Sequence, residues 1–223
     1  MAVAWSYSVL NSFETCAYRH YKVKVEKSVI EQQGEALLHG NRVHKALEHR
    51  VKSKTPLSDS MRIYEPLVAR LEKSANGGRI VAEQQMALTD KYQPTGWFGK
   101  GANAPWVRAI TDVSIFKGAK AFVGDYKTGK RDPVSAQLRL VAATAFIVNP
   151  QIEVIHSAFL WLKTNEIDQE VFRREDAAAL WQEFIPRVRR LEIAFDTGVW
   201  PKKPSGLCRN HCPVPRSMCE HRG

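Results

Sequence analysis

The stretch VRAITDVSIFKGAKAFVGDYK, residues 107–127, holds two apolar runs separated by the short polar turn KGAK. Runs of Val, Ile and Phe on both sides of a turn that contains glycine predict two antiparallel strands. A tight turn centred on Gly118 and Ala119 places Asp112 directly opposite Asp125. The stretch therefore predicts a hairpin that brings two carboxylates together.

The paired acids and a neighbouring lysine predict a metal site. Directly opposed side chains in an antiparallel pair leave the sheet on one face, with Cβ atoms about 4.5–5.5 Å apart. Two carboxylates that close repel each other, and a divalent cation between them removes the conflict. Mg²⁺ or Mn²⁺ suits such oxygen ligands and keeps positions open for water and phosphate. Lys127 lies two residues beyond Asp125, so its ammonium shares that face and would act on a water that attacks a phosphodiester.

A surface ion pair is the alternative interpretation of Asp125 and Lys127, because Asp-x-Lys on an exposed strand is usually no more than that. Two features favour the metal site. One is the acid on the opposite strand, and the other is the apolar run 121–123, which indicates an interior strand.

Composition indicates a folded chain with an anionic partner. Of 223 residues, 44% are hydrophobic, which excludes a disordered protein. Lys and Arg outnumber Asp and Glu by 33 to 23, giving a formal charge of +10, so nucleic acid is the first candidate partner. No run of about 18 apolar residues and no cationic leader is present, and we expect a cytoplasmic protein without a membrane segment.

The rest of the chain alternates helices with strands. Apolar spacing of three and four predicts helices over residues 9–21, 34–51, 61–75, 135–149 and 174–195. Strands are expected over residues 80–88 and 152–163, and a loop rich in Gly, Pro and aromatic residues over 89–106. Pro186 is expected to kink or divide the last helix. These elements predict an α/β fold.

His44 lies in the middle of the apolar face of the helix predicted over residues 34–51, between Gly40 and Leu47. A lone histidine on such a face is more often a satisfied core residue than a metal ligand. Sequence pattern alone leaves both roles open for His44.

An ordered set of motifs resembles the PD-(D/E)XK nuclease superfamily. The matching stretches are SYSVLNSFETCAYRHY (6–21), GNRVHKALE (40–48), AITDVSI (109–115), GDYKTGK (124–130), the glutamine of SAQLRL and the terminal cysteines. Within the superfamily the chain is similar to the RecB-like exonuclease branch, which includes the CRISPR-associated iron-sulfur exonuclease and phage relatives. The resemblance implies a restriction-endonuclease-like core, with a central mixed sheet flanked by helices.

The resemblance also implies a division of the chain. Residues 1–34 would form an N-terminal helical segment that contributes one cysteine, residues 35–200 the nuclease core, and residues 201–223 a C-terminal cysteine segment. A cysteine-ligated metal appendage would then join both termini.

Residue by residue, the resemblance assigns roles in the site. Asp112 and Asp125 would bind the metal together with the Tyr126 backbone carbonyl, and Lys127 would act on the attacking water. His44 matches a histidine that reaches the same metal from a helix.

Two further residues match less completely. Gln137 corresponds to the glutamine of a Gln-x-x-x-Tyr element that holds the site and the DNA, but Val141 occupies the tyrosine position, so no aromatic partner is expected. Glu83 matches a strand acid found near such sites, and an ordinary solvated edge glutamate is the alternative.

The four cysteines lie at the two ends of the chain: Cys16 near the N-terminus, and Cys208, Cys212 and Cys219 near the C-terminus. In a reducing compartment such cysteines are more often metal ligands or free thiols than disulfides. The resemblance implies that all four hold a structural 4Fe-4S cluster. Zinc held by the three C-terminal cysteines with a nearby histidine, His211 or His221, is the rival, and unliganded thiols are the third option.

Residues outside the metal site are candidates for DNA contact. Lys130 and Arg131 follow the second strand of the hairpin. Trp97, Phe98 and Trp106 lie in the Gly-rich loop, where they would stack on unpaired bases or else anchor the loop. We expect a divalent-metal-dependent DNA exonuclease that acts on single strands or DNA ends in recombination, repair or processing, with recombination or replication proteins as partners. The alternative is a DNA-binding or recombination accessory protein without catalysis, which the intact Asp, Asp and Lys disfavour.

Overall fold

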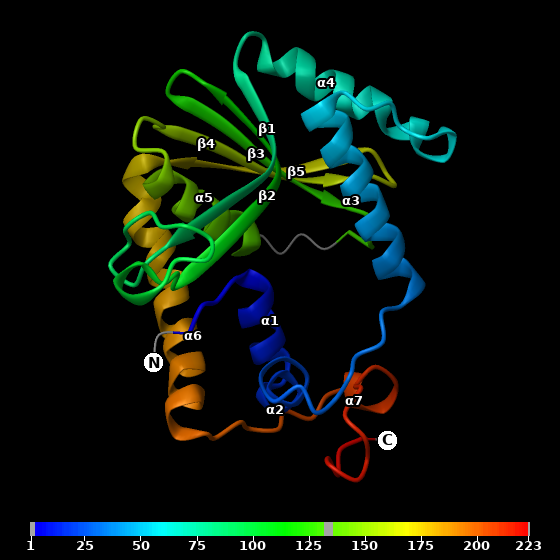
Figure 1. Cartoon of the computed structure of the whole chain (residues 1–223), viewed down its shortest axis with the longest axis vertical. Coiled ribbons are helices and arrows are strands. Elements are labelled where there is room, and N and C mark those ends of the chain that lie inside the picture. The colour runs from blue at the N-terminus through cyan, green and yellow to red at the C-terminus, as the bar shows by residue number, and fades with distance from the viewer. Residues whose placement is uncertain (1–2, 132–135, 223) are drawn as a thin grey trace.

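The computed structural model describes residues 3–131 and 136–222, which form a five-stranded sheet with helices on both faces (Figure 1). The strands are β1 (Arg79–Leu88), β2 (Val107–Lys117), β3 (Lys120–Lys127), β4 (Val154–Trp161) and β5 (Glu166–Arg173), in the spatial order β1-β2-β3-β4-β5. Among these five described strands, β3 and β4 run parallel and the other neighbours are antiparallel. The sheet is therefore mixed, as expected.

The predicted hairpin forms between β2 and β3 with the predicted register. Val113 pairs with Gly124, and Gly118 has a φ of +56° at the turn, a conformation that glycine adopts without steric cost. The backbone pairing ends at Val113 and Gly124, which adjoin Asp112 and Asp125 in sequence. Beyond this point the Tyr126 N–H donates a hydrogen bond of 2.6 Å to the Asp112 carboxylate. The two acids therefore lie where the hairpin stops pairing.

Two hydrophobic layers hold the helices against the sheet. On one face, α3 (Glu35–Ser53) and α4 (Glu65–Ala75) pack on a core that includes Val43, Val113 and Tyr126. On the other face, α1 (Tyr7–Thr15), α5 (Ala136–Val148) and α6 (Ala177–Thr197) share a larger core with Val123 and Phe146. Figure 1 shows the sheet between α3 and α4 on one side and α5 and α6 on the other, with α1 below it.

Three elements differ from their prediction. The first helix breaks at Cys16, whose backbone is extended, and continues as α2 (Ala17–His20) and a π-helical turn over 21–25. Strand β5 escaped prediction because it is an edge strand with mostly exposed, charged residues. Helix α6 runs unbroken through Pro186, so the prolyl residue does not divide it. Ser135, the predicted start of α5, lies outside the described residues.

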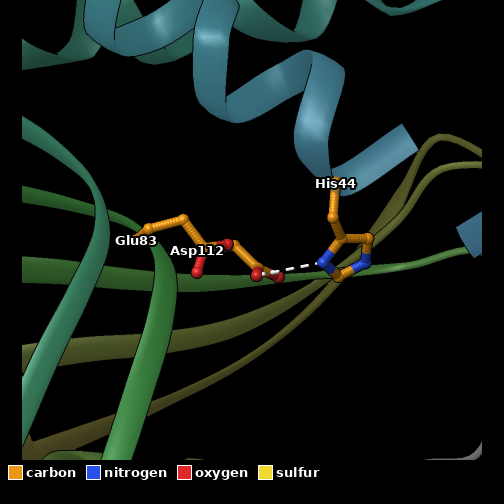
Figure 2. A group of neighbouring side chains, drawn as sticks. All are labelled: His44, Glu83 and Asp112. Carbon is orange, nitrogen blue, oxygen red and sulfur yellow. Dashed lines mark hydrogen bonds and ion pairs between the residues drawn. The ribbon is translucent and has the colours of Figure 1, made fainter. Parts of the chain in front are cut away.

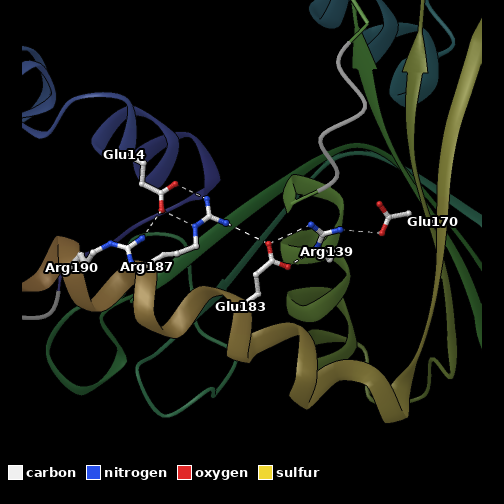
Figure 3. Close-up of polar contacts among 6 residues, drawn as sticks. All are labelled: Glu14, Arg139, Glu170, Glu183, Arg187 and Arg190. Carbon is white, nitrogen blue, oxygen red and sulfur yellow. Dashed lines mark hydrogen bonds and ion pairs between the residues drawn. The ribbon is translucent and has the colours of Figure 1, made fainter. Parts of the chain in front are cut away.

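A chain of ion pairs links α1, α6, α5 and β5 (Figure 3). Glu14 accepts two hydrogen bonds from Arg187, at 2.8 and 2.7 Å, and Arg139 donates one of 2.6 Å to Glu183. The members are Glu14, Arg139, Glu170, Glu183, Arg187 and Arg190. Bidentate guanidinium–carboxylate pairs fix geometry better than isolated surface pairs do, so this network sets the position of α1 relative to the sheet.

The N- and C-terminal segments lie side by side below the sheet, where α1, α2 and α7 (Leu207–Asn210) meet (Figure 1). The Tyr18 N–H donates to the Pro201 carbonyl at 3.1 Å, and its hydroxyl donates to the Met218 carbonyl at 3.0 Å. Tyr21 stacks on Trp200 with ring centroids 5.1 Å apart. Within residues 3–131 and 136–222, none of the helices has the length and apolar character that a membrane crossing requires.

Candidate active site

Three side chains from three elements converge beside the hairpin (Figure 2). His44 extends from α3, Glu83 from β1 and Asp112 from β2, and one ligand atom of each lies within 4.8 Å of the other two. The His44 Nδ1 atom is 3.0 Å from the Asp112 Oδ1 atom. One nitrogen and two carboxylates at this separation match the donor set of a divalent cation site.

Glu83 reaches this group because β1 is distorted at that residue. Ala82 and Gln84 pair with β2 on either side, whereas Glu83 interrupts the pairing opposite Asp112 and has a φ of +50°. A residue with a side chain rarely adopts this left-handed conformation, which costs roughly 1–3 kcal/mol when the surrounding structure enforces it. Such local strain is typical of a functional position, and it favours a role in the site over a solvated edge glutamate.

His44 is brought to the site by a close approach of α3. Gly40 lies one helical turn before His44, and a Cβ atom at Gly40 would be 3.0 Å from the Thr128 hydroxyl oxygen. The lack of a side chain thus lets α3 cross near the residues that follow β3. The His44 ring meets the Tyr126 ring edge-on at 5.9 Å, and the Tyr126 N–H donates to the Asp112 carboxylate that His44 also contacts. The backbone of Tyr126 therefore adjoins the three converging side chains.

Asp125, Lys127 and Gln137 form a closed triangle next to this group. The Lys127 Nζ atom is 2.7 Å from the Asp125 Oδ2 atom and donates to the Gln137 side-chain oxygen at 3.0 Å. The Gln137 amide donates to the Asp125 Oδ1 atom at 2.6 Å. Gln137 extends from the first turn of α5, so it holds the acid and the lysine of β3 in a fixed relation.

The site carries an excess of buried negative charge. Burial and then the charge of Asp112 raise the pKa of Asp125, although Lys127 opposes the shift. Burial, followed by the charges of Asp112 and Glu48, raises the pKa of Glu83. Burial opposes protonation of His44, yet its hydrogen bond to Asp112 and the charges of Asp112 and Asp125 raise the pKa of the imidazole. A bound cation would offset this charge.

These residues line one open cleft of about 890 Å³. Its walls include His44, Glu83, Asp112, Asp125, Lys127, Gln137 and the first residues of α1. The acids and the lysine predicted from the hairpin thus share one cavity with the predicted histidine and glutamine.

The predicted DNA contacts divide into two groups. Trp97 lines the cleft, whereas Trp106 is only 8% exposed and its indole N–H donates to Glu192 at 3.0 Å, so Trp106 anchors the loop. Lys130 is exposed on the segment after β3. Arg131 is held by Asp168, to which its Nε atom donates at 2.9 Å.

Sequence reasoning missed Arg108, which also lines the cleft. Arg108 precedes Asp112 by four residues on β2, so strand alternation could have placed both on one face. The pattern could not show that Arg108 lacks an acidic partner within residues 3–131 and 136–222.

The four cysteines line a second cavity, of about 180 Å³, between the two ends of the chain. All are free thiols, and His211 and His221 line the same cavity. Arg19, Lys202 and Lys203 add positive charge to its wall. The structure thus brings Cys16 to the three C-terminal cysteines despite their distance in sequence.

Comparison with known proteins identifies the chain. A model of the PD-(D/E)XK nuclease superfamily matches residues 4–220, while no curated protein matches the chain. Among solved structures, a protein from Eubacterium rectale described as "Putative exonuclease" is similar over 96% of this chain and 92% of its own, with 15% sequence identity and a TM-score of 0.49. The mixed sheet flanked by helices is the restriction-endonuclease-like core expected from the sequence. With nearly its whole length matched, the chain belongs to the PD-(D/E)XK nuclease superfamily.

Proposed function

We propose that this nuclease is a divalent-metal-dependent DNA exonuclease that acts on single strands or DNA ends. The observation that carries the proposal is the convergence of His44, Glu83 and Asp112 within 4.8 Å, beside the Asp125–Lys127 pair. Recombination, repair or DNA processing is the proposed setting, with recombination or replication proteins as partners in the cytoplasm.

The donor set fits Mg²⁺ or Mn²⁺, with His44, Glu83, Asp112, Asp125 and the Tyr126 carbonyl as the proposed ligands. The raised pKa of Asp125 and of Glu83 supports this fit, because a cation would relieve the repulsion that raises them. The imidazole nitrogen of His44 favours Mn²⁺ over Mg²⁺. When bound, the metal would acidify a water molecule and polarise the phosphate.

Lys127 and Gln137 are the proposed partners of the acids in catalysis. The Lys127 ammonium, which Asp125 and Gln137 hold in place, would donate hydrogen bonds to the attacking water and to the phosphoryl oxygens as their charge grows. Gln137 keeps Asp125 and Lys127 aligned and is a positioning residue. Water is the nucleophile, so no covalent intermediate is required.

A 4Fe-4S cluster held by Cys16, Cys208, Cys212 and Cys219 is the cofactor we propose for the second cavity. The Ser205 N–H donates to the Cys208 sulfur at 3.4 Å, and the basic residues of the wall would offset the charge of four thiolates.

A single zinc ion fits this cavity less well. Its four ligands would lie about 3.8 Å apart for Zn–S bonds of about 2.3 Å. A zinc site made of the three C-terminal cysteines and a nearby histidine would leave Cys16 unused, although Cys16 lines the same cavity. The fourth cysteine therefore favours a cluster. Lys130, Arg131 and Trp97 are the proposed DNA contacts outside the metal site.

The test is hydrolysis of end-labelled DNA with Mn²⁺ by the purified protein and by Asp125→Ala prepared in parallel. We expect the wild type to shorten the strand from an end, and Asp125→Ala to leave it intact. Equal degradation by both would trace the activity to a contaminant. Absence of degradation by both, with DNA binding retained, would favour the accessory protein.

A further inference from the structure

Arg108 lines the same cleft as the four acids Glu48, Glu83, Asp112 and Asp125 and the two lysines Lys45 and Lys127. Among the described residues, its guanidinium forms no ion pair, and its Nε atom is buried without a hydrogen-bond partner. Arg131, Arg139 and Arg187, by contrast, each bind a carboxylate. An unpaired buried donor is costly unless a ligand completes it, so Arg108 is poised for an anion that enters the cleft.

Two aromatic rings hold the Arg108 guanidinium in position. Its central carbon lies 5.3 Å from the Trp97 ring centroid and 6.0 Å from that of Phe98. Phe98 is 81% exposed, although the loop that carries it is anchored in the core by Trp106. The loop thus presents two aromatic faces and a positive charge beside the metal-ligating side chains.

The position of Arg108 along β2 sets its distance from the reaction. Four residues of strand separate it from Asp112, which corresponds to about 13–14 Å along the strand. That length spans roughly two nucleotides of an extended single strand. A phosphate at Arg108 would therefore belong to the same strand as the scissile phosphate, near but outside the metal site.

We propose that Arg108 binds a backbone phosphate of single-stranded DNA about two nucleotides from the scissile bond, while Trp97 and Phe98 stack on an unpaired base. This inference rests on the proposed function, because it takes the carboxylate–histidine group as the place of hydrolysis. Stacking requires a base that is free of its complement, so the cleft selects a single strand over a blunt duplex.

Binding without hydrolysis tests the proposal. Fluorescence anisotropy in EDTA measures the affinity for three labelled DNAs: a 12-nucleotide oligo-dT, the same backbone with abasic sites, and a blunt hairpin duplex. The variants are Arg108→Ala, Trp97→Ala and Phe98→Ala. Arg79→Ala is the matched control, since Arg79 also rests on an aromatic ring, that of Phe116 at 4.6 Å, but does not line the cleft.

We expect Arg108→Ala to weaken oligo-dT binding about tenfold and to reduce the salt dependence by roughly one phosphate contact, a slope change of about 0.7. Arg79→Ala should stay within about twofold of the wild type. The wild type should prefer oligo-dT to the abasic strand about tenfold, and Trp97→Ala and Phe98→Ala should reduce that preference. Phe98→Ala keeps the test valid if Trp97→Ala disturbs the loop.

Equal weakening by Arg108→Ala and Arg79→Ala would overturn the phosphate role. Equal affinity of the wild type for oligo-dT and the abasic strand would overturn the stacking role, and equal affinity for oligo-dT and the duplex would overturn the selection of single strands. Since no strand is cut in EDTA, these affinities are independent of the Mn²⁺ assay. A failure of hydrolysis is thereby separated from a failure of strand binding.

Discussion

The carboxylate–histidine site and the cysteine cavity are built in opposite ways. The first rests on β1, β2 and α3, next to fully buried residues such as Val43, Leu47 and Val113. The second lies on short helices and turns, and Val214 is the buried apolar residue of the described tail 201–222. The core thus organises the first site before any metal binds. The tail has little core of its own, so its order would depend on the cluster that we propose for the cysteines.

The largest expected effect is on catalysis in the candidate active site, which the core holds in place. Lys127→Ala should lower DNA hydrolysis by about 10²–10⁴-fold with the melting temperature little changed, because the ammonium acts on the transition state and the core holds the strand. Single-turnover cleavage of end-labelled DNA with Mn²⁺ measures the rate, and anisotropy should show that DNA binding survives.

Lys120→Ala is the matched control, since Lys120 is an exposed lysine at the other end of β3. It should cleave like the wild type. Cleavage by Lys127→Ala within about threefold of the wild type, a difference under 1 kcal/mol, would remove Lys127 from the reaction.

His44→Ala should have the next largest effect. Loss of one proposed ligand should reduce Mn²⁺-dependent cleavage by about 10–100-fold. The fold should remain, because the cleft rather than the core receives the imidazole. His39→Ala, at an exposed position of the same helix, is the control. Unfolding of His44→Ala, seen by circular dichroism, would mean that His44 is a core residue.

Cys16→Ser tests whether the region around the cysteine cavity depends on a bound cluster. The variant should lose the visible absorbance expected of an iron-sulfur cluster, and its melting temperature should fall by about 5 °C, or roughly 2 kcal/mol for a chain of this length. Asp112→Asn should keep the absorbance, because the two regions are independent. A colourless wild type that contains zinc, with zinc retained in Cys16→Ser, would instead assign the C-terminal cysteines to a local zinc site.

The smallest expected effect is on stability without metal, where Glu83→Gln should be slightly stabilising. The pKa of Glu83 is raised in the folded chain, so ionisation of this carboxyl reduces stability as the pH rises from the unfolded-state pKa through the raised folded-state pKa. In EDTA at pH 8 the variant should melt slightly above the wild type, and the gain should vanish as the pH falls toward about 4.3, the pKa of an unfolded glutamate. A lower melting temperature at pH 8 would show that the carboxylate is stabilised by contacts instead.

The parts of the site that sequence predicted are those fixed by local pairing. A short turn at Gly118 sets the β2–β3 register, so Asp112 and Asp125 could be placed opposite each other from the residues alone. The position of Glu83 opposite Asp112 could not be derived in this way. It depends on the β1–β2 register, which is set across a long loop, and on the φ of +50° at Glu83. Arg108 was missed for a related reason, since the absence of an acidic partner in the described part of the chain is a tertiary property.

Cation binding tests the central claim most directly. Titration of Mn²⁺ followed by electron paramagnetic resonance reports the free ion, so bound Mn²⁺ is obtained by difference for the wild type and for Asp112→Asn. We predict saturable binding to the wild type and its loss in Asp112→Asn, with the visible absorbance of the cysteine region unchanged. Equal binding by the two proteins would show that His44, Glu83 and Asp112 do not hold the catalytic metal.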